Sequence, residues 1–140
     1  MKKTLFALSA LVMLASCKKD GATTTNPTKE QLVGSYKLVN VMGKVNNMPE
    51  EDITDDNFDE CEQDDVTTLN ADNTYAYADA GTQCSPNGTR NGSWSVSGNT
   101  FTVDGVVSTI KSFSNNNLVL TNSQSVGGVS VVITTTFRKQ

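Results

Sequence analysis

The chain of 140 residues contains no histidine. Histidine is the commonest general base, the usual partner of serine and cysteine nucleophiles, and the usual ligand of zinc and copper. Serine, threonine and carboxylate side chains are abundant, but no stretch sets a nucleophile, a base and an oxyanion donor in a recognisable order. We therefore predict that the protein is not an enzyme and uses neither a cofactor nor a metal ion.

The chain also lacks a long hydrophobic segment. Its apolar run at residues 5–14 is shorter than the ~20 residues that a transmembrane helix needs. The run follows Lys2 and Lys3 and precedes small residues, which is the pattern of an export signal. We predict that residues 1–16 are a signal peptide.

Positive charge is scarce. The chain has 11 Lys and Arg against 15 Asp and Glu, and none of the basic residues lies between Lys44 and Arg90. A negative net charge disfavours nucleic acid and anionic lipid head groups as partners. Ten of the 16 residues from 50 to 65 are Asp or Glu. Such oxygen-rich clusters suit calcium, but this segment lacks the spacing and the glycine of a calcium loop, so we expect a solvated acidic loop.

Only three cysteines are present, and the first follows the apolar run. Leu14-Ala15-Ser16-Cys17 resembles the lipobox of bacterial lipoproteins, in which the cysteine is acylated after the preceding peptide is removed. The resemblance implies lipidation at Cys17 and attachment to a membrane through acyl chains, without a spanning segment. The alternative is an ordinary secretory signal followed by an unrelated cysteine.

The residues after Cys17 bear on the compartment. In the lipoprotein family, lysine rather than aspartate at the next position favours the outer membrane of a Gram-negative bacterium, and Lys18 occupies it here. Lys18-Lys19-Asp20 also resembles a signal for export to the cell surface, so a periplasmic and a surface-facing protein both stay open. Residues 17–30 are polar and predict a flexible tether.

With Cys17 assigned to acylation by that resemblance, Cys61 and Cys84 remain, and a disulfide between them suits an oxidising compartment. The alternative is two free or redox-active thiols. Against it, the chain has no C-x-x-C spacing, and no basic residue near Cys61 lowers the pKa of its thiol. The two cysteines bracket a hairpin predicted to turn at Asp72-Asn73.

Short alternating segments separated by turn residues predict an all-β fold. Thr28 to Gln31 has capping-box spacing and predicts one helical turn before the first strand. Pro49 excludes a central strand nearby. Counting gives an eight-stranded antiparallel up-and-down barrel over residues 31–140, with strands at residues 32–42, 66–70, 74–78, 92–97, 100–104, 106–113, 118–121 and 129–138.

The order of these elements resembles the lipocalin-like domain of small bacterial lipoproteins. The resemblance rests on residues 32–38, on the cysteine-bracketed hairpin, on residues 92–95 and on residues 135–139. In true lipocalins the first strand begins with Gly-x-Trp, and an arginine of the last strand packs on that indole. Here Tyr36 takes the tryptophan position, so the resemblance implies a cation–π contact with Arg138 that closes one barrel end. The alternative is a buried tyrosine and an exposed arginine that never meet.

The barrel interior decides the function that we expect. Eight strands enclose a space that side chains fill or that holds one small molecule. A cavity of at least ~300 Å³ favours a non-enzymatic binding module for a small hydrophobic ligand, whereas a solid interior favours a structural or protein–protein interaction module of the envelope. Phe58 is a candidate to plug one barrel end. The candidate ligand-binding residues are Tyr36, Tyr75, Tyr77, Trp94 and Phe101.

Overall fold

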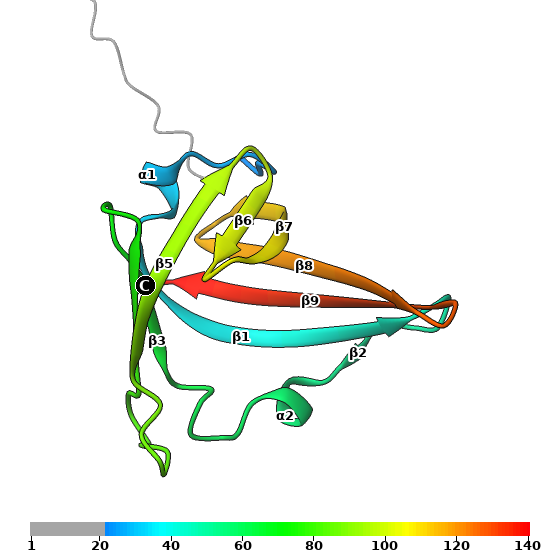
Figure 1. Ribbon diagram of the computed structural model, residues 1–140, viewed down its shortest axis with the longest axis horizontal. Helices are drawn as coiled ribbons and strands as arrows, with labels where there is room; N and C mark the ends of the chain where they lie inside the picture. The colour runs from blue at the N-terminus through cyan, green and yellow to red at the C-terminus, as the bar shows by residue number, and fades with distance from the viewer. Residues whose placement is uncertain (1–21) are drawn as a thin grey trace, which may run out of the picture.

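The computed structural model describes residues 22–140, which form a closed antiparallel β-barrel of eight strands (Figure 1). The strands follow one another in chain order, and pairing of the first with the last closes the barrel. The predicted all-β, up-and-down architecture is therefore confirmed. The barrel strands are β1 (Gly34–Val45), β3 (Val66–Leu69), β4 (Thr74–Ala78), β5 (Arg90–Ser97), β6 (Thr100–Val103), β7 (Val106–Ser114), β8 (Asn117–Val126) and β9 (Val129–Lys139).

The helical turn α1 (Lys29–Leu32) begins with the predicted capping box. The Thr28 hydroxyl accepts a hydrogen bond from the Gln31 backbone N–H, and the Gln31 side chain accepts one from the Thr28 N–H. Our placement of Leu32 in the first strand was wrong, because it ends this helix. Its side chain is fully buried in the barrel end that α1 covers.

The chain is already attached to the barrel before α1. Thr24 forms a β-bridge with Phe113 of β7, with backbone N–H to O distances of 3.1 and 2.7 Å. Pro27 is also buried. The flexible tether predicted over residues 17–30 therefore does not extend past Thr24 in the part of the chain that the structure describes.

The acidic region after β1 is more ordered than we expected. It contains the two-residue strand β2 (Glu51–Asp52), which pairs with β1, and the helical turn α2 (Thr54–Asn57). A bulge in β1 explains part of this order, because the Thr54 hydroxyl accepts the hydrogen bond of the Val41 N–H there at 2.8 Å. Most of the carboxylates are exposed, but Asp65 is buried, and the prediction of a solvated loop throughout this region was wrong.

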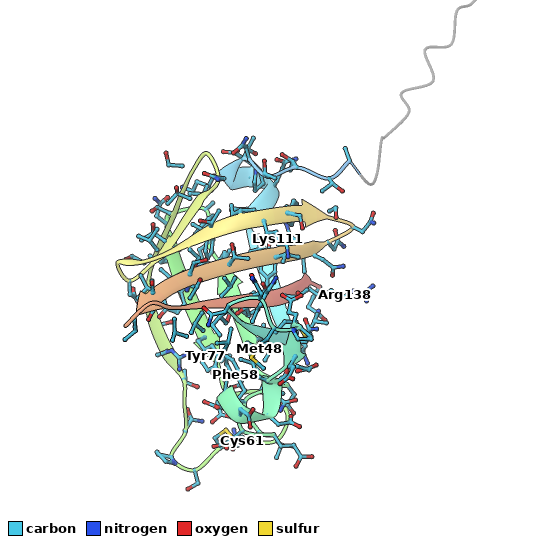
Figure 2. The ribbon with its side chains drawn as sticks, turned by 90° about the vertical axis from the view of Figure 1, so that its right-hand side faces the viewer. Met48, Phe58, Cys61, Tyr77, Lys111 and Arg138 are labelled. Atoms are coloured by element: carbon cyan, nitrogen blue, oxygen red, sulfur yellow. A yellow bond between two sulfur atoms is a disulfide. The ribbon has the colours of Figure 1, made fainter. Side chains whose placement is uncertain are left out.

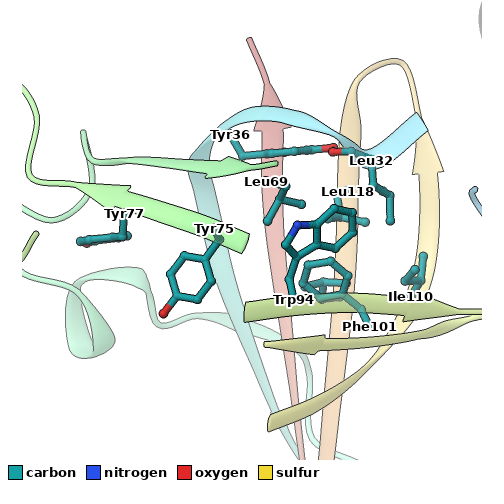
Figure 3. Packing of buried hydrophobic residues seen from close by; sticks show 10 residues of the cluster. Leu32, Tyr36, Leu69, Tyr75, Tyr77, Trp94, Phe101, Ile110 and Leu118 are labelled. Carbon is teal, nitrogen blue, oxygen red and sulfur yellow. The ribbon is translucent and has the colours of Figure 1, made fainter. Parts of the chain in front are cut away.

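Buried side chains fill the barrel end next to α1, and the same cluster continues to Tyr75 and Tyr77 nearer the other end (Figure 3). Trp94 and Phe101 pack on each other with their ring centroids 5.9 Å apart. The Tyr36 hydroxyl donates to the Leu32 carbonyl at 2.7 Å, and the Trp94 indole N–H donates to the Asn70 carbonyl at 3.0 Å. These buried side chains close this end of the barrel, and the polar atoms of its tyrosine and tryptophan rings are hydrogen-bonded.

Candidate functional site

Beyond the closed end, the barrel contains an apolar cavity of about 230 Å³. Each of the eight barrel strands contributes at least one side chain to the lining, and Phe58 adds one from the segment between α2 and β3. The lining is mostly aromatic and aliphatic. Its floor is formed by residues of the buried cluster, including Tyr36, Leu69, Phe101 and Leu118. The cavity is therefore the space left between the packed core and the open end of the barrel.

The mouth of the cavity lies at the end away from α1, where Phe58, Tyr77 and Arg90 contribute to its lining. Figure 2 shows Phe58 and Tyr77 in the same half of the molecule as Cys61. The Arg90 guanidinium carbon lies 3.9 Å from the centroid of the Tyr77 ring, which is cation–π geometry. Burial, followed by the neighbouring carboxylate of Asp65, raises the pKa of the Tyr77 phenol, so it stays neutral at physiological pH.

Tyr75 is held in the cavity wall by a hydrogen bond to Asp104. The Tyr75 hydroxyl donates to Asp104 Oδ2 at 2.6 Å, and the Ser93 N–H donates to Asp104 Oδ1 at 2.8 Å. These bonds lower the pKa of Asp104, and the bond to Asp104 raises the pKa of Tyr75. Gly92 makes the arrangement possible, because a Cβ at this position would collide with both Tyr75 and Asp104.

A disulfide between Cys61 and Cys84 fixes the loops at the mouth, with a Cα–Cα distance of 5.4 Å. It joins the segment before β3 to the loop between β4 and β5. This pairing is the one expected from the lipobox resemblance, and it rules out two free thiols in this structure.

Buried carboxylates organise the same loops. Asp79 accepts hydrogen bonds from the backbone N–H groups of Cys84 at 3.2 Å and Gly88 at 3.1 Å. Asp65 accepts one from the Ala80 N–H at 2.8 Å. The loop crosses the open barrel end without pairing to a strand, and these carboxylates accept the backbone hydrogen bonds that a neighbouring strand would otherwise accept.

In residues 22–140, no group of three or more acidic or cysteine side chains is arranged to hold a metal ion.

Four of the five predicted ligand-binding residues line the cavity: Tyr36, Tyr75, Tyr77 and Phe101. Trp94 does not, because its indole is directed into the closed end. Strand alternation identified all five as inward-facing, but it does not say at which height along the barrel each side chain sits.

The predicted contact between Tyr36 and Arg138 is not formed. Tyr36 pairs with Lys139 across β1 and β9, whereas Arg138 pairs with Lys37 on the outer face and is exposed. The buried side of this end is covered by Lys139, whose ammonium group donates to the Gln31 carbonyl at 2.8 Å. Our assignment was wrong by one residue, which reverses the side of the sheet.

Arg90 is the charged lining residue that the sequence analysis missed. It is the first basic residue after Lys44, and so it is an isolated cation in the acidic part of the chain. That isolation was a usable signal.

A second hollow, of about 640 Å³, lies on the outer surface of β7, β8 and β9. It is larger than the interior cavity, but hydroxyl and charged side chains line it, among them Thr109, Thr121 and Lys44. It is also open to solvent and lacks an aromatic wall. The apolar cavity inside the barrel is therefore the better candidate for a small-molecule site.

Comparisons with known proteins agree with this architecture. A family model described as a lipocalin-like domain matches residues 32–120, and one described as a prokaryotic membrane lipoprotein lipid attachment site matches residues 1–17. The second match ends at Cys17, the predicted acylation site, which lies outside the described residues. Searches of curated proteins and of solved structures found no match.

No helix within residues 22–140 is long and apolar enough to cross a bilayer. The chain belongs to the family of lipocalin-like domains and is a lipoprotein anchored to a membrane through its lipid attachment site.

Proposed function

We propose that this lipoprotein is a non-enzymatic binding protein whose barrel holds one small amphipathic molecule. The observation that carries the proposal is the apolar cavity of about 230 Å³, closed at the α1 end and open at the other. A packed core of this size would normally leave few voids larger than a water molecule. A connected apolar space therefore calls for an occupant.

The volume limits the size of that occupant. A cavity of ~150 Å³ lined by apolar side chains binds benzene, whereas sites for drug-sized ligands begin at ~300 Å³. At about 230 Å³ the barrel fits a molecule with one aromatic ring or a short acyl chain. Because the volume is below the ~300 Å³ that we set for a typical binding module, larger ligands such as long-chain lipids are disfavoured.

The polar end of the ligand is indicated by Arg90. Its guanidinium lies at the mouth and packs on the Tyr77 ring. A guanidinium presents a planar set of N–H donors, and this geometry matches the two oxygens of a carboxylate. The remaining lining is mostly apolar, and the Tyr75 hydroxyl is already bonded to Asp104. We therefore favour a small carboxylate whose apolar part enters the barrel.

We place the protein in the outer membrane of a Gram-negative bacterium, facing the periplasm or the cell surface. The support is the lipid attachment site together with Lys18 after Cys17, because aspartate at that position would favour the inner membrane. The absence of histidine from the chain supports a role in binding rather than catalysis.

Isothermal titration calorimetry of the mature, lipidated protein in detergent tests the proposal, with benzoate as the carboxylate probe and benzyl alcohol as its neutral counterpart. We expect benzoate to bind with a negative heat-capacity change, and more tightly than benzyl alcohol. Arg90→Gln should weaken benzoate and leave benzyl alcohol nearly unchanged. Arg138→Gln, on the outer face, is the matched control.

A substitution that fills the cavity distinguishes binding inside the barrel from binding at its outer surface. Val103→Phe places a larger side chain into the cavity, whereas Val107→Phe makes the same change at an exposed position on the outer face. Only Val103→Phe should abolish binding of both probes. If neither probe binds the wild type, or if both variants behave alike, the binding proposal fails and an interaction module of the envelope replaces it.

A further inference from the structure

The charges of the barrel are separated between its two ends. Five basic residues, here called the basic surface, lie at or near the closed end, whereas ten of the 16 residues from 50 to 65, beside the mouth, are acidic. Figure 2 shows Lys111 and Arg138 in the half of the molecule that carries α1, with Cys61 at the opposite end. The negative net charge therefore does not describe the closed end. The basic surface consists of Lys29, Lys37, Lys111, Arg138 and Lys139.

Several contacts place these residues together. Arg138 and Lys37 are directly paired on the outer faces of β9 and β1. Lys139 donates to the Gln31 carbonyl, and Lys29 of α1 donates to Asn73 in the turn between β3 and β4.

Lys111 adds a further positive charge to the closed end, and few acidic residues lie beside it. Lys111 lies two residues before Phe113, where the N-terminal chain joins β7. Glu30 and Asp72 are acidic residues of the same end, so the basic residues outnumber them.

The lipid anchor leaves the barrel at this same end. The lipid attachment match ends at Cys17, and the Thr24–Phe113 bridge fixes the chain seven residues later. Seven residues span at most ~24 Å when fully extended. Thr24 is therefore always within that distance of Cys17, and the intervening residues include Lys18, Lys19 and Asp20, which together carry a net positive charge.

We propose that the basic surface docks on anionic phospholipid head groups of the bilayer that holds the acyl anchor. The closed end then faces the membrane, and the cavity mouth and the acidic region face away from it. Clusters of Lys and Arg beside a membrane anchor favour anionic lipids, by roughly fivefold in binding for each basic residue. The short tether keeps this surface close to the bilayer, so modest attraction is enough to orient the barrel.

The orientation has a consequence for ligand exchange. Because the mouth at Tyr77 and Arg90 is directed away from the bilayer, a ligand enters from the aqueous phase and not from the hydrocarbon layer. A lipid-anchored carrier with the opposite orientation would take its ligand from the membrane.

Energy transfer from a barrel label to an acceptor on lipid head groups tests the orientation. Mature lipidated protein is inserted into vesicles of phosphatidylethanolamine and phosphatidylglycerol, with a single added cysteine at Gln140 (Gln140→Cys), at the closed end, or at Asp56 (Asp56→Cys), in α2. Both positions are exposed, and the native cysteines are either disulfide-bonded or at the predicted acylation site. We expect stronger transfer from the closed-end label. Equal transfer, or stronger transfer from the α2 label, overturns the proposal.

Charge variants test the cause. Arg138→Glu, within the basic surface, should reduce the difference between the two labels and weaken docking by at least about fivefold. Val126→Glu, at an exposed position at the far end of β8, adds a negative charge away from the basic surface and should leave the difference in place. Vesicles of phosphatidylcholine alone should remove the difference. If the difference persists on them, or if both variants act alike, the tether alone sets the orientation and the docking surface is refuted.

Discussion

Removal of the Cys61–Cys84 disulfide should destabilise the barrel substantially. The bond joins residues 23 positions apart in sequence. In the chain-entropy model, a crosslink that closes a loop of this size stabilises the folded state by ~3 kcal/mol. A small domain has a total stability of about 5–15 kcal/mol, so this one bond is a large share of it.

The loop between β4 and β5 is the part of the barrel that loses a constraint when the disulfide is removed. The disulfide and Asp79 both fix the loop between β4 and β5, which has no strand partner of its own across the barrel mouth. The double variant Cys61→Ala/Cys84→Ala keeps the Asp79 hydrogen bonds but frees the loop ends in the unfolded chain. We expect the barrel to fold with a melting temperature lower by roughly 10 °C.

Thermal unfolding, followed by the fluorescence of Trp94, measures the effect. The wild type under reducing conditions and the double variant should have the same lowered midpoint, and reducing agent should not affect the variant. An unchanged midpoint for the double variant would refute the reasoning, because the crosslink would then contribute nothing to the stability of the domain.

Three further predictions concern the core and the cavity wall. Gly92→Ala should destabilise the protein by about 1–3 kcal/mol in urea unfolding, because its methyl group displaces Tyr75 or Asp104; a neutral result would mean that the wall is not closely packed there. Leu32→Ala, at a fully buried site, should cost about 2–5 kcal/mol by the same assay, and a cost below ~1 kcal/mol would contradict a closed end built on this side chain. The folded pKa of Asp104 is lowered, so its contribution to stability is present above the unfolded pKa of about 3.9 and is lost as the pH falls through the folded pKa. Asp104→Asn should therefore flatten the decline of the unfolding midpoint with acid, and a decline as steep as that of the wild type would count against the bond to Tyr75.

The strands could be predicted because their signals are local. Alternating side chains identify a half-buried strand, and residues that tolerate positive φ identify its turns: Asn73 has a φ of 72° in the hairpin that the cysteines bracket, and Asn116 has a φ of 65° between β7 and β8. The second half of β8 was missed because residues 122–125 are Asn, Ser, Gln and Ser, and β9 rather than any apolar pattern holds them in the sheet.

The acidic region could not be predicted in the same way. Its order comes from contacts with β1, where Ile53 packs against Gly43 and Thr54 satisfies the Val41 N–H at a bulge. A bulge leaves no mark on a single sequence, and a lone isoleucine among carboxylates gives no periodicity. Only the folded sheet shows why these residues are needed.

The candidate site was found in part. Inward-facing aromatics follow from alternation, but the height of Trp94 in the barrel and the choice between Arg138 and Lys139 depend on the exact register of β1 and β9. One residue of error places a side chain on the opposite face. Arg90 lies at the start of β5, where the alternating pattern has not yet begun, so its approach to Tyr77 is set by pairing with β4.

The central claim is that the barrel interior receives a small carboxylate with its apolar part inward. Nuclear Overhauser contacts between benzoate and the isotope-labelled, lipidated protein measure this directly. The account predicts contacts from the ligand ring to Leu69, Phe101 and Leu118 in the cavity floor. Contacts confined to exposed side chains such as Val107, or none at saturating benzoate, would contradict it.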